Sequence, residues 1–216
     1  MFTKTLLSIS TAAILMSGAA FADTEATAWT DLNMRSGPGP MYTIVGLIPA
    51  NANVMVQGCV ADASWCSVTY EGVTGWASGS YMTANVENAP VALAGGDERL
   101  VIQTMTYDNT ENVAAGGLAA GAIAGALIAG PVGAAIGGVL GAGAGAVAAP
   151  DPTIITYIQN NPVEQIFLDG EVVVGVGIPD TVILAPVPDS QYSYAYLNGV
   201  PVLIETKNRT VTYIVR

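Results

Sequence analysis

Histidine is absent from the 216 residues of this chain, and basic residues are scarce, with six Lys and Arg against 17 Asp and Glu. Without histidine the chain cannot form a Ser-His or Cys-His nucleophile, or a metal site with histidine ligands. A carboxylate pair or a Ser-Lys arrangement would still be open to an enzyme, but no motif points to either. We therefore predict a protein that is not an enzyme and that holds neither a metal ion nor an organic cofactor.

Residues 1–22 have the pattern of a secretory signal peptide. Lys4 supplies the positive start, an apolar run follows, and Ala20-Phe21-Ala22 places small residues at both recognition positions before Asp23. The apolar run is shorter than the roughly 20 residues of a membrane-spanning helix, and no cysteine stands at the cleavage point, so neither a retained anchor nor a lipoprotein is favoured. We expect export to the periplasm or cell envelope.

The exported chain would be strongly acidic. Removal of Lys4 leaves five basic and 17 acidic residues, a net charge of −12. Nucleic-acid binding requires clusters of Lys and Arg that neutralise phosphates. The composition therefore excludes nucleic acid as a partner, and acidity of this kind favours solubility and repulsion between copies.

The chain has two cysteines, Cys59 and Cys66. Disulfides form and persist outside the cytoplasm, and one β-type run ends at Cys59 while the next begins at Cys66. Cross-strand neighbours in an antiparallel pair lie at the separation that a disulfide requires. A metal site built on this pair would lack the further ligands that soft metals need. We predict one disulfide between them.

The region from residue 23 to residue 84 has the pattern of a small β-barrel. Short β-type runs are separated by Gly-rich or Asp/Ser-rich breaks. The runs are residues 43–47, 53–60, 65–70 and 75–77. Glu71-Gly72 separates two β-rich stretches by the length of a tight hairpin turn.

Several short motifs in this region point to a known family. They are Leu32-Asn33-Met34-Arg35-Ser36-Gly37-Pro38-Gly39-Pro40, Gly58-Cys59, Trp65-Cys66, Gly75-Trp76 and Tyr81-Met82. With these motifs the region resembles bacterial SH3-like domains, and the paired cysteines match a subset of that family. The resemblance implies a small barrel that acts as a targeting or binding module.

Aromatic residues are the candidates for a ligand-binding face, because they offer large, rigid contact area at small entropic cost. The candidate ligand-binding residues are Tyr42, Tyr70, Trp76 and Tyr81. The alternative is that Trp65 and Trp76 are mainly core residues that close the barrel.

Residues 85–112 are predicted to be a linker. Pro90, Gly95 and Gly96 stand among acidic residues with little periodic apolar pattern, which is typical of a flexible joint. Residues 99–107 alternate weakly and have the character of a strand, whose partner the sequence does not identify.

Residues 113–149 contain no charged or polar side chain and include 11 Gly and 15 Ala. Seven glycines recur at multiples of four: Gly117, Gly121, Gly125, Gly133, Gly137, Gly141 and Gly145. On a helix this spacing makes a smooth groove that another helix backbone can approach closely. The segment resembles the glycine zippers of envelope proteins, and we predict helix packing through these glycines.

Pro131, near the middle of this segment, predicts a helical hairpin with two arms that each reach nearly across a bilayer. A hairpin of this kind favours membrane association or self-association. A buried helical pair or a low-complexity spacer outside lipid is the alternative, because Gly and Ala are only weakly apolar.

The region from residue 150 to the end of the chain is predicted to be a small α+β domain. A short helix is expected at residues 153–160, followed by β-type runs at residues 165–168 and 171–176. Three later runs, at residues 192–197, 200–205 and 211–215, form an antiparallel meander. Asn198-Gly199 supplies its first tight turn.

One face of the meander is expected to carry Tyr192, Tyr194 and Tyr196, since alternate residues of a strand share a face. The motifs of this domain are Thr156-Tyr157-Ile158, Asn161-Pro162-Val163, Glu171-Val172-Val173-Val174-Gly175, Val187-Pro188, Tyr196-Leu197-Asn198-Gly199-Val200-Pro201-Val202-Leu203 and residues 211–216. With them the region resembles a domain-of-unknown-function family, number 1236, of exported bacterial proteins. The resemblance implies no activity.

The fold class that follows is multi-module and mainly β. An SH3-like β-barrel (residues 23–84) and a linker precede a Gly/Ala-rich α-helical hairpin and a small α+β C-terminal domain (residues 150–216) with an antiparallel meander. We predict a non-catalytic envelope protein whose barrel binds a cell-wall peptide or an envelope protein, and whose zipper anchors or oligomerises the chain. Two alternatives are a membrane-perturbing or pore-forming zipper protein and an accessory subunit of peptidoglycan-processing machinery.

Overall fold

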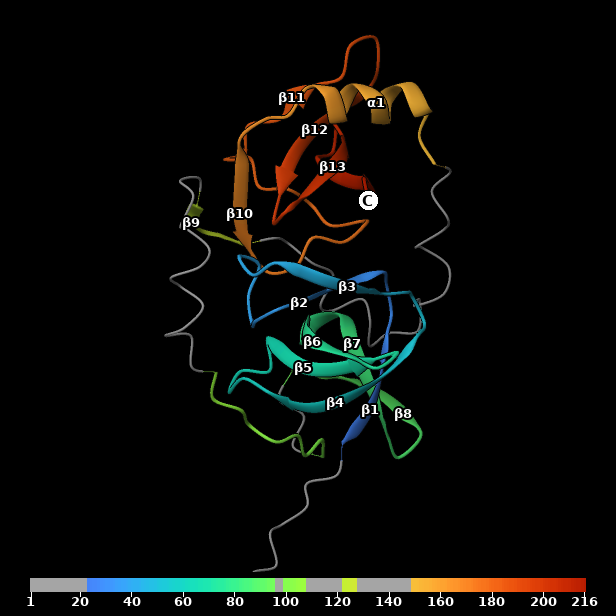
Figure 1. The fold of residues 1–216 in the computed structure, drawn as a ribbon, viewed down its shortest axis with the longest axis vertical. Coiled ribbons are helices and arrows are strands. Elements are labelled where there is room, and N and C mark those ends of the chain that lie inside the picture. Colours follow the sequence, from blue (N-terminus) through green and yellow to red (C-terminus); the bar gives the residue numbers. More distant parts are fainter. Residues whose placement is uncertain (1–22, 96–98, 108–121, 128–148) are drawn as a thin grey trace, which may run out of the picture.

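Two β-rich domains pack against each other in the computed structural model, which describes residues 23–95, 99–107, 122–127 and 149–216 (Figure 1). The N-terminal domain, blue to green in Figure 1, is built from strands alone apart from one short 3-10 helix. The C-terminal domain, orange to red, has one α-helix above a small sheet.

The N-terminal domain is a strongly curved eight-stranded sheet with the order β3-β2-β6-β5-β4-β1-β7-β8. Its elements are β1 (Thr24–Ala28), β2 (Leu32–Arg35), β3 (Ile44–Ile48), β4 (Asn53–Cys59), β5 (Trp65–Tyr70), β6 (Val73–Ser78), η1 (Gly79–Tyr81), β7 (Met82–Val86) and β8 (Ala89–Ala92). The predicted β-type runs correspond to β3, β4, β5 and β6, while β1, β2, β7 and β8 were not predicted as strands.

The turn and the disulfide of this domain agree with the sequence prediction. Glu71 and Gly72 both have positive φ, 49° and 80°, as the tight turn between β5 and β6 requires. Cys59 on β4 lies directly opposite Cys66 on β5, and the two form a disulfide.

The first part of the predicted linker (residues 85–112) belongs to the last two strands of the barrel sheet. The barrel sheet continues through β7 and β8, and Leu93 N–H donates to the Met82 carbonyl at 3.0 Å. Pro90 fits this strand because β8 lies at the edge of the sheet, where no ladder hydrogen bond from a proline is needed. Pro90, which the sequence pattern assigned to a flexible joint, lies in the hairpin of β7 and β8 at the edge of the sheet.

Residues 99–107 find their partner at the end of β4. Cys59 N–H donates to the Gln103 carbonyl at 2.9 Å, and Met105 N–H donates to the Cys59 carbonyl at 2.7 Å. The segment therefore lies on the barrel beside the disulfide, with a single parallel bridge between Cys59 and Thr104.

Within the Gly/Ala-rich segment, the described residues apart from Ala149 form a strand, β9 (Ala122–Leu127), which pairs in parallel with β10 (Gln165–Asp169). The helix prediction is wrong for these residues. Each glycine costs a helix about 1 kcal/mol relative to alanine, and the edge of β10 offers hydrogen bonds to a strand. The rest of the predicted hairpin lies outside the described residues. Among the described residues, no helix has the length and hydropathy needed to cross a membrane.

The C-terminal domain contains α1 (Pro152–Asn160), β10 (Gln165–Asp169), β11 (Ala185–Pro186), β12 (Tyr192–Leu197), β13 (Val200–Glu205) and β14 (Thr210–Ile214). The helix begins one residue before the predicted start because Asp151 caps it, accepting the Thr153 N–H at 2.9 Å, and because Pro152 suits a first helical position. The antiparallel meander β12-β13-β14 is confirmed, and Asn198 and Gly199 have the positive φ of its tight turn.

The tyrosine face of β12 is also confirmed, because Tyr192, Tyr194 and Tyr196 all pack in the cluster beneath α1. Two of the hydroxyls hold the helix from below. Tyr194 donates to the Asn161 carbonyl at 2.7 Å, and Tyr196 donates to the Ile158 carbonyl at 3.2 Å.

Residues 171–176 are not the strand that the sequence predicted. They form an irregular segment after β10 in which Glu171, Val172, Val173 and Val176 are all buried. Four buried side chains in six residues do not fit the alternation of a half-exposed strand. The segment is apolar because it packs against the N-terminal domain.

Candidate functional site

The contact between the two domains contains a buried pair of charged side chains, Arg35 and Glu171. Arg35 ends β2 and Glu171 follows β10, and their side chains are 1% and 0% exposed. Arg35 Nε donates to Glu171 Oε2 at 2.6 Å, and Nη2 donates to Oε1 at 2.8 Å. This is the bidentate geometry that a guanidinium and a carboxylate adopt at their strongest.

Every donor of the Arg35 guanidinium has an acceptor. Nη1 donates to the carbonyls of Pro40 and Tyr42, both at 2.9 Å, and the second Nη2 donor reaches the Asn198 carbonyl at 2.9 Å. Together with the two bonds to Glu171 these account for all five N–H groups of an arginine. Arg35 therefore holds the loop after β2 and the C-terminal domain together, and has no donor left for a ligand.

The Glu171 carboxylate is equally occupied. Besides Arg35, its Oε1 accepts from Asn33 Nδ2 at 3.1 Å and from the Val172 N–H at 3.0 Å. The paired, hydrogen-bonded state is what makes burial of two charges tolerable. The ion pair is part of the architecture.

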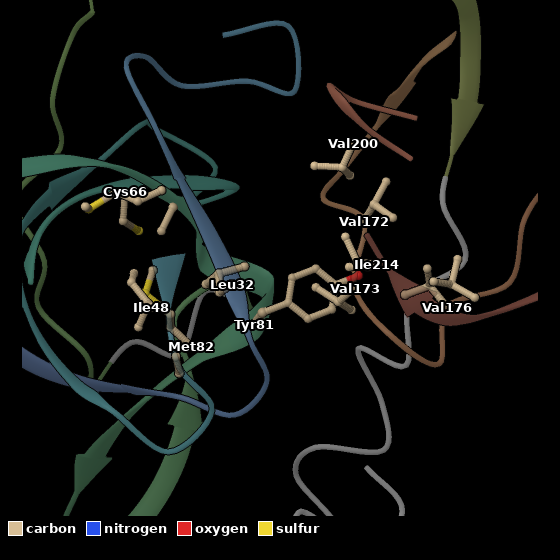
Figure 2. Close-up of a cluster of buried hydrophobic side chains, with 14 of the residues drawn as sticks. Leu32, Ile48, Cys66, Tyr81, Met82, Val172, Val173, Val176, Val200 and Ile214 are labelled. Atoms are coloured by element: carbon tan, nitrogen blue, oxygen red, sulfur yellow. The ribbon is translucent and has the colours of Figure 1, made fainter. Parts of the chain in front are cut away.

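Apolar side chains surround the ion pair and merge the two domains into one core. Figure 2 shows Tyr81 extending from the barrel, beside Leu32, toward Val172 and Val173 of the C-terminal domain. The Tyr81 hydroxyl lies 3.4 Å from the Glu171 carbonyl. Burial, and secondly the charge of Glu171, raise the pKa of Tyr81 to about 12.

The four aromatic residues proposed for ligand binding do not form one face. Tyr81 is 4% exposed and lies in the domain contact. Tyr42 and Trp76 lie on either side of Tyr107, with edge-to-face ring centroids 5.6 Å and 5.3 Å from it. Tyr70 is half-buried and packs against the core shared by the domains.

Tyr107 comes from the segment that follows the barrel, and sequence reasoning did not include it. Its hydroxyl lies 3.5 Å from the Ser36 carbonyl, so it bridges the aromatic pair and the loop after β2. Trp65 and Trp76 are both buried, which agrees with the alternative that they close the barrel.

A second concentration of functional side chains lies on the outer face of β4, β1 and β7. We call it the polar groove; it is lined by Thr24, Glu25, Thr27, Asn53, Thr83 and Asn85, and its volume is about 420 Å³. Strand alternation turns five of these side chains outward, because Ala26, Ala28, Val54 and Ala84 on the same strands are buried; the exception, Thr24, has the parity of Ala26 and Ala28 and lines the groove at the start of β1.

None of the groove residues was a sequence candidate. Polar Glu25 and Thr27 alternate with small apolar Ala26 and Ala28, which is the period-two signal of a half-buried strand. That signal could have identified β1, but only the sheet order places β4 and β7 on either side of it.

The zipper glycines have a separate outcome. Gly125 lies in strand β9. The other six, Gly117, Gly121, Gly133, Gly137, Gly141 and Gly145, lie outside the described residues.

Comparison with known proteins agrees with the two domains. Over 63 residues the chain is 36% identical to a Bacillus subtilis protein named "Putative N-acetylmuramoyl-L-alanine amidase YrvJ"; the match covers 29% of this chain and 12% of that protein. Residues 30–83 match the family model of the bacterial SH3 domain, and residues 157–216 match that of a domain of unknown function, DUF1236. The chain thus combines a bacterial SH3 domain with a DUF1236 domain.

Proposed function

We propose that this protein is a non-catalytic, exported envelope protein whose SH3 barrel binds a component of the cell wall. The observation that carries the proposal is the bacterial SH3 barrel itself, matched over residues 30–83 and cross-linked by a disulfide between β4 and β5. Bonds of this type persist in oxidising compartments. The relative's name refers to an N-acetylmuramoyl-L-alanine amide, a linkage of the wall, and this supports the wall as the binding partner.

The composition supports binding without catalysis. The chain has no histidine, so the acid-base and metal chemistry typical of wall hydrolysis lacks its usual side chain. The matched stretch is a small part of the relative, so its activity does not extend to this chain by similarity.

The C-terminal domain acts in this proposal as a fixed part of the binding unit. It occupies the barrel face that carries Leu32, Arg35 and Tyr81. A wall ligand therefore binds elsewhere on the barrel, and the pair of domains presents one rigid surface to it.

The test is co-sedimentation of the chain from residue 23 onward with purified peptidoglycan sacculi. The affinity tag belongs at the C-terminus, because Thr24 at the start of β1 lines the polar groove. The expected result is saturable binding that persists at moderate salt. The acidic chain is not attracted non-specifically to the carboxylates of sacculi, so binding does not depend on a charge attraction that salt would screen. Absence of saturable binding would contradict the proposal.

The Gly/Ala-rich segment serves as a tether or a self-association element in this proposal. The support is the four-residue glycine repeat, which favours close packing of segments. Tethering raises the effective concentration of the barrel near the wall. Envelope fractionation with alkaline washing, comparing the full chain with a version lacking residues 113–149, tests it. Retention of the full chain and release of the deletion are expected, and equal release of both would contradict the tether.

The relative's name favours a second candidate, an accessory subunit of peptidoglycan-processing machinery. In that role the protein would bring a separate hydrolase to the wall. Addition of the purified chain to a sacculus-digestion assay should then accelerate a partner amidase, and no change in rate would remove this candidate.

A further inference from the structure

The polar groove is a hollow of the barrel that lies away from the domain contact. None of its lining residues belongs to the core shared by the domains. In Figure 1, β1 begins at the end of the barrel that points away from the C-terminal domain. The volume of the polar groove, about 420 Å³, is in the range of sites for small ligands.

Part of the groove is already ordered. Thr27 Oγ1 donates to Asn53 Oδ1 at 2.9 Å, and Asn53 Nδ2 donates to Glu25 Oε1 at 2.8 Å. These two hydrogen bonds fix the orientation of the Asn53 amide and of one Glu25 oxygen. They do not use the second amide hydrogen of Asn53 or the second carboxylate oxygen of Glu25. Preordered polar groups lose less entropy when a ligand binds.

The remaining lining residues supply further polar groups. Thr24, Thr83 and Asn85 make no side-chain hydrogen bond to any other described residue. Two hydroxyls and an amide each combine donors and acceptors. The groove therefore presents mixed donors and acceptors from three adjacent strands.

The lining also excludes several classes of ligand. None of its described lining residues is Lys or Arg, so they offer no counter-charge to a phosphate or a free carboxylate. No aromatic or aliphatic residue is among the lining residues that the structure describes, so these residues form no pocket for an apolar peptide side chain. A neutral molecule with many hydroxyl and amide groups is the class that matches what remains.

We propose that the polar groove binds a neutral N-acetylated sugar unit of a glycan strand. Sugar hydroxyls donate to Glu25 and accept from Asn53, Asn85 and the threonine hydroxyls, and the acetamido group pairs with a side-chain amide. The inference rests on the proposed wall-binding function and identifies the part of the wall that is recognised.

The experiment uses the chain from residue 23 onward and two probes, purified sacculi and soluble oligomers of N-acetylglucosamine. The groove variants are Asn85→Ala, which removes no hydrogen bond between described residues, and Asn53→Ala, which removes two. Thr74→Ala, an exposed residue on β6 outside the groove, is the matched control. Urea unfolding of each variant verifies the fold.

The expected result is binding of both probes by the unchanged chain and by Thr74→Ala, with affinity reduced about tenfold in each groove variant, the equivalent of a lost hydrogen bond or two. If sacculi bind equally to all variants, the groove inference is overturned while the wall-binding function stands. If the oligomer binds in the groove but sacculi do not bind at all, the wall-binding function fails while the groove inference stands.

A further variant separates glycan from peptide as the occupant. Glu25→Gln keeps the shape of the side chain and removes its charge, so binding of a neutral sugar should change less than threefold. If Glu25→Gln abolishes sacculus binding and soluble stem peptides compete better than the sugar oligomer, the occupant is a cationic peptide group and the glycan assignment is wrong.

Discussion

Replacement of Glu171 by alanine should destabilise both domains together. The substitution removes a carboxylate that accepts four hydrogen bonds, from Arg35 Nε and Nη2, Asn33 Nδ2 and the Val172 N–H. It also leaves the Arg35 charge, 1% exposed, without its counter-ion. Loss of one partner of a buried ion pair costs about 3–5 kcal/mol, which is a large share of the roughly 5–15 kcal/mol of a typical domain.

Tryptophan fluorescence during urea unfolding provides the assay, because Trp29, Trp65 and Trp76 are the three tryptophans and all belong to the barrel. Glu171 belongs to the C-terminal domain, so a lower fluorescence midpoint in Glu171→Ala reports coupling between the domains. The control is Glu164→Ala, which changes an exposed glutamate and should shift stability by less than about 0.5 kcal/mol.

The double variant Arg35→Met/Glu171→Leu distinguishes loss of the ion pair from loss of packing. Removing both charges leaves no buried ion without a partner, so the double variant should be more stable than Glu171→Ala by about 2 kcal/mol or more. A fluorescence midpoint in Glu171→Ala equal to that of Glu164→Ala would refute the reasoning, since it would mean that the barrel unfolds independently of the C-terminal domain.

Three further predictions concern single features. Replacing both Cys59 and Cys66 by alanine should lower the free energy of unfolding by about 2.5 kcal/mol for an eight-residue loop, and a reductant should affect the unchanged chain but not this variant. Burial raises the pKa of Tyr81 to about 12, so the contribution of its neutral hydroxyl to the free energy of unfolding is complete below pH 10 and is lost as the pH rises toward 12. Between pH 10 and 12, Tyr81→Phe should therefore lose less stability than the unchanged chain, as measured by urea unfolding. Hydrogen bonds from the side chain and backbone of Thr153 lower the pKa of Asp151 below 3.8, so the stability difference between the unchanged chain and Asp151→Ala should be present at neutral pH and vanish as the pH falls below that value; a constant difference in thermal midpoint would contradict this.

Local chemistry was sufficient to predict several elements from the sequence. The Glu71-Gly72 and Asn198-Gly199 turns need positive φ at both positions, and few residue pairs accept it. The helix at Pro152–Asn160 has its capping aspartate and its proline in sequence, and the disulfide joins cysteines only seven positions apart. Each of these features depends on residues that are close together in the sequence.

Features that depend on distant residues were not predicted. The buried partners Arg35 and Glu171 are separated by 136 positions, and each alone resembles an ordinary surface charge. Residues 171–176 were assigned to a strand because apolar runs in a sheet and apolar runs at a domain contact have the same composition. Tyr81 was proposed for ligand binding because aromatic side chains offer large, rigid contact area. The sequence does not reveal that the C-terminal domain covers this side chain.

The domain contact also determines how the two proposals relate to each other. All five donors of Arg35 are used within the chain, and Tyr81 is buried against the C-terminal domain. A ligand that used this face would first have to separate the domains, at the cost of exposing an ion pair and a shared apolar core. Binding at the polar groove requires no such separation, because none of its lining residues belongs to the core shared by the domains. A variant that weakens the contact, such as Glu171→Ala, should therefore lower stability while leaving the affinity of the folded protein for glycan unchanged.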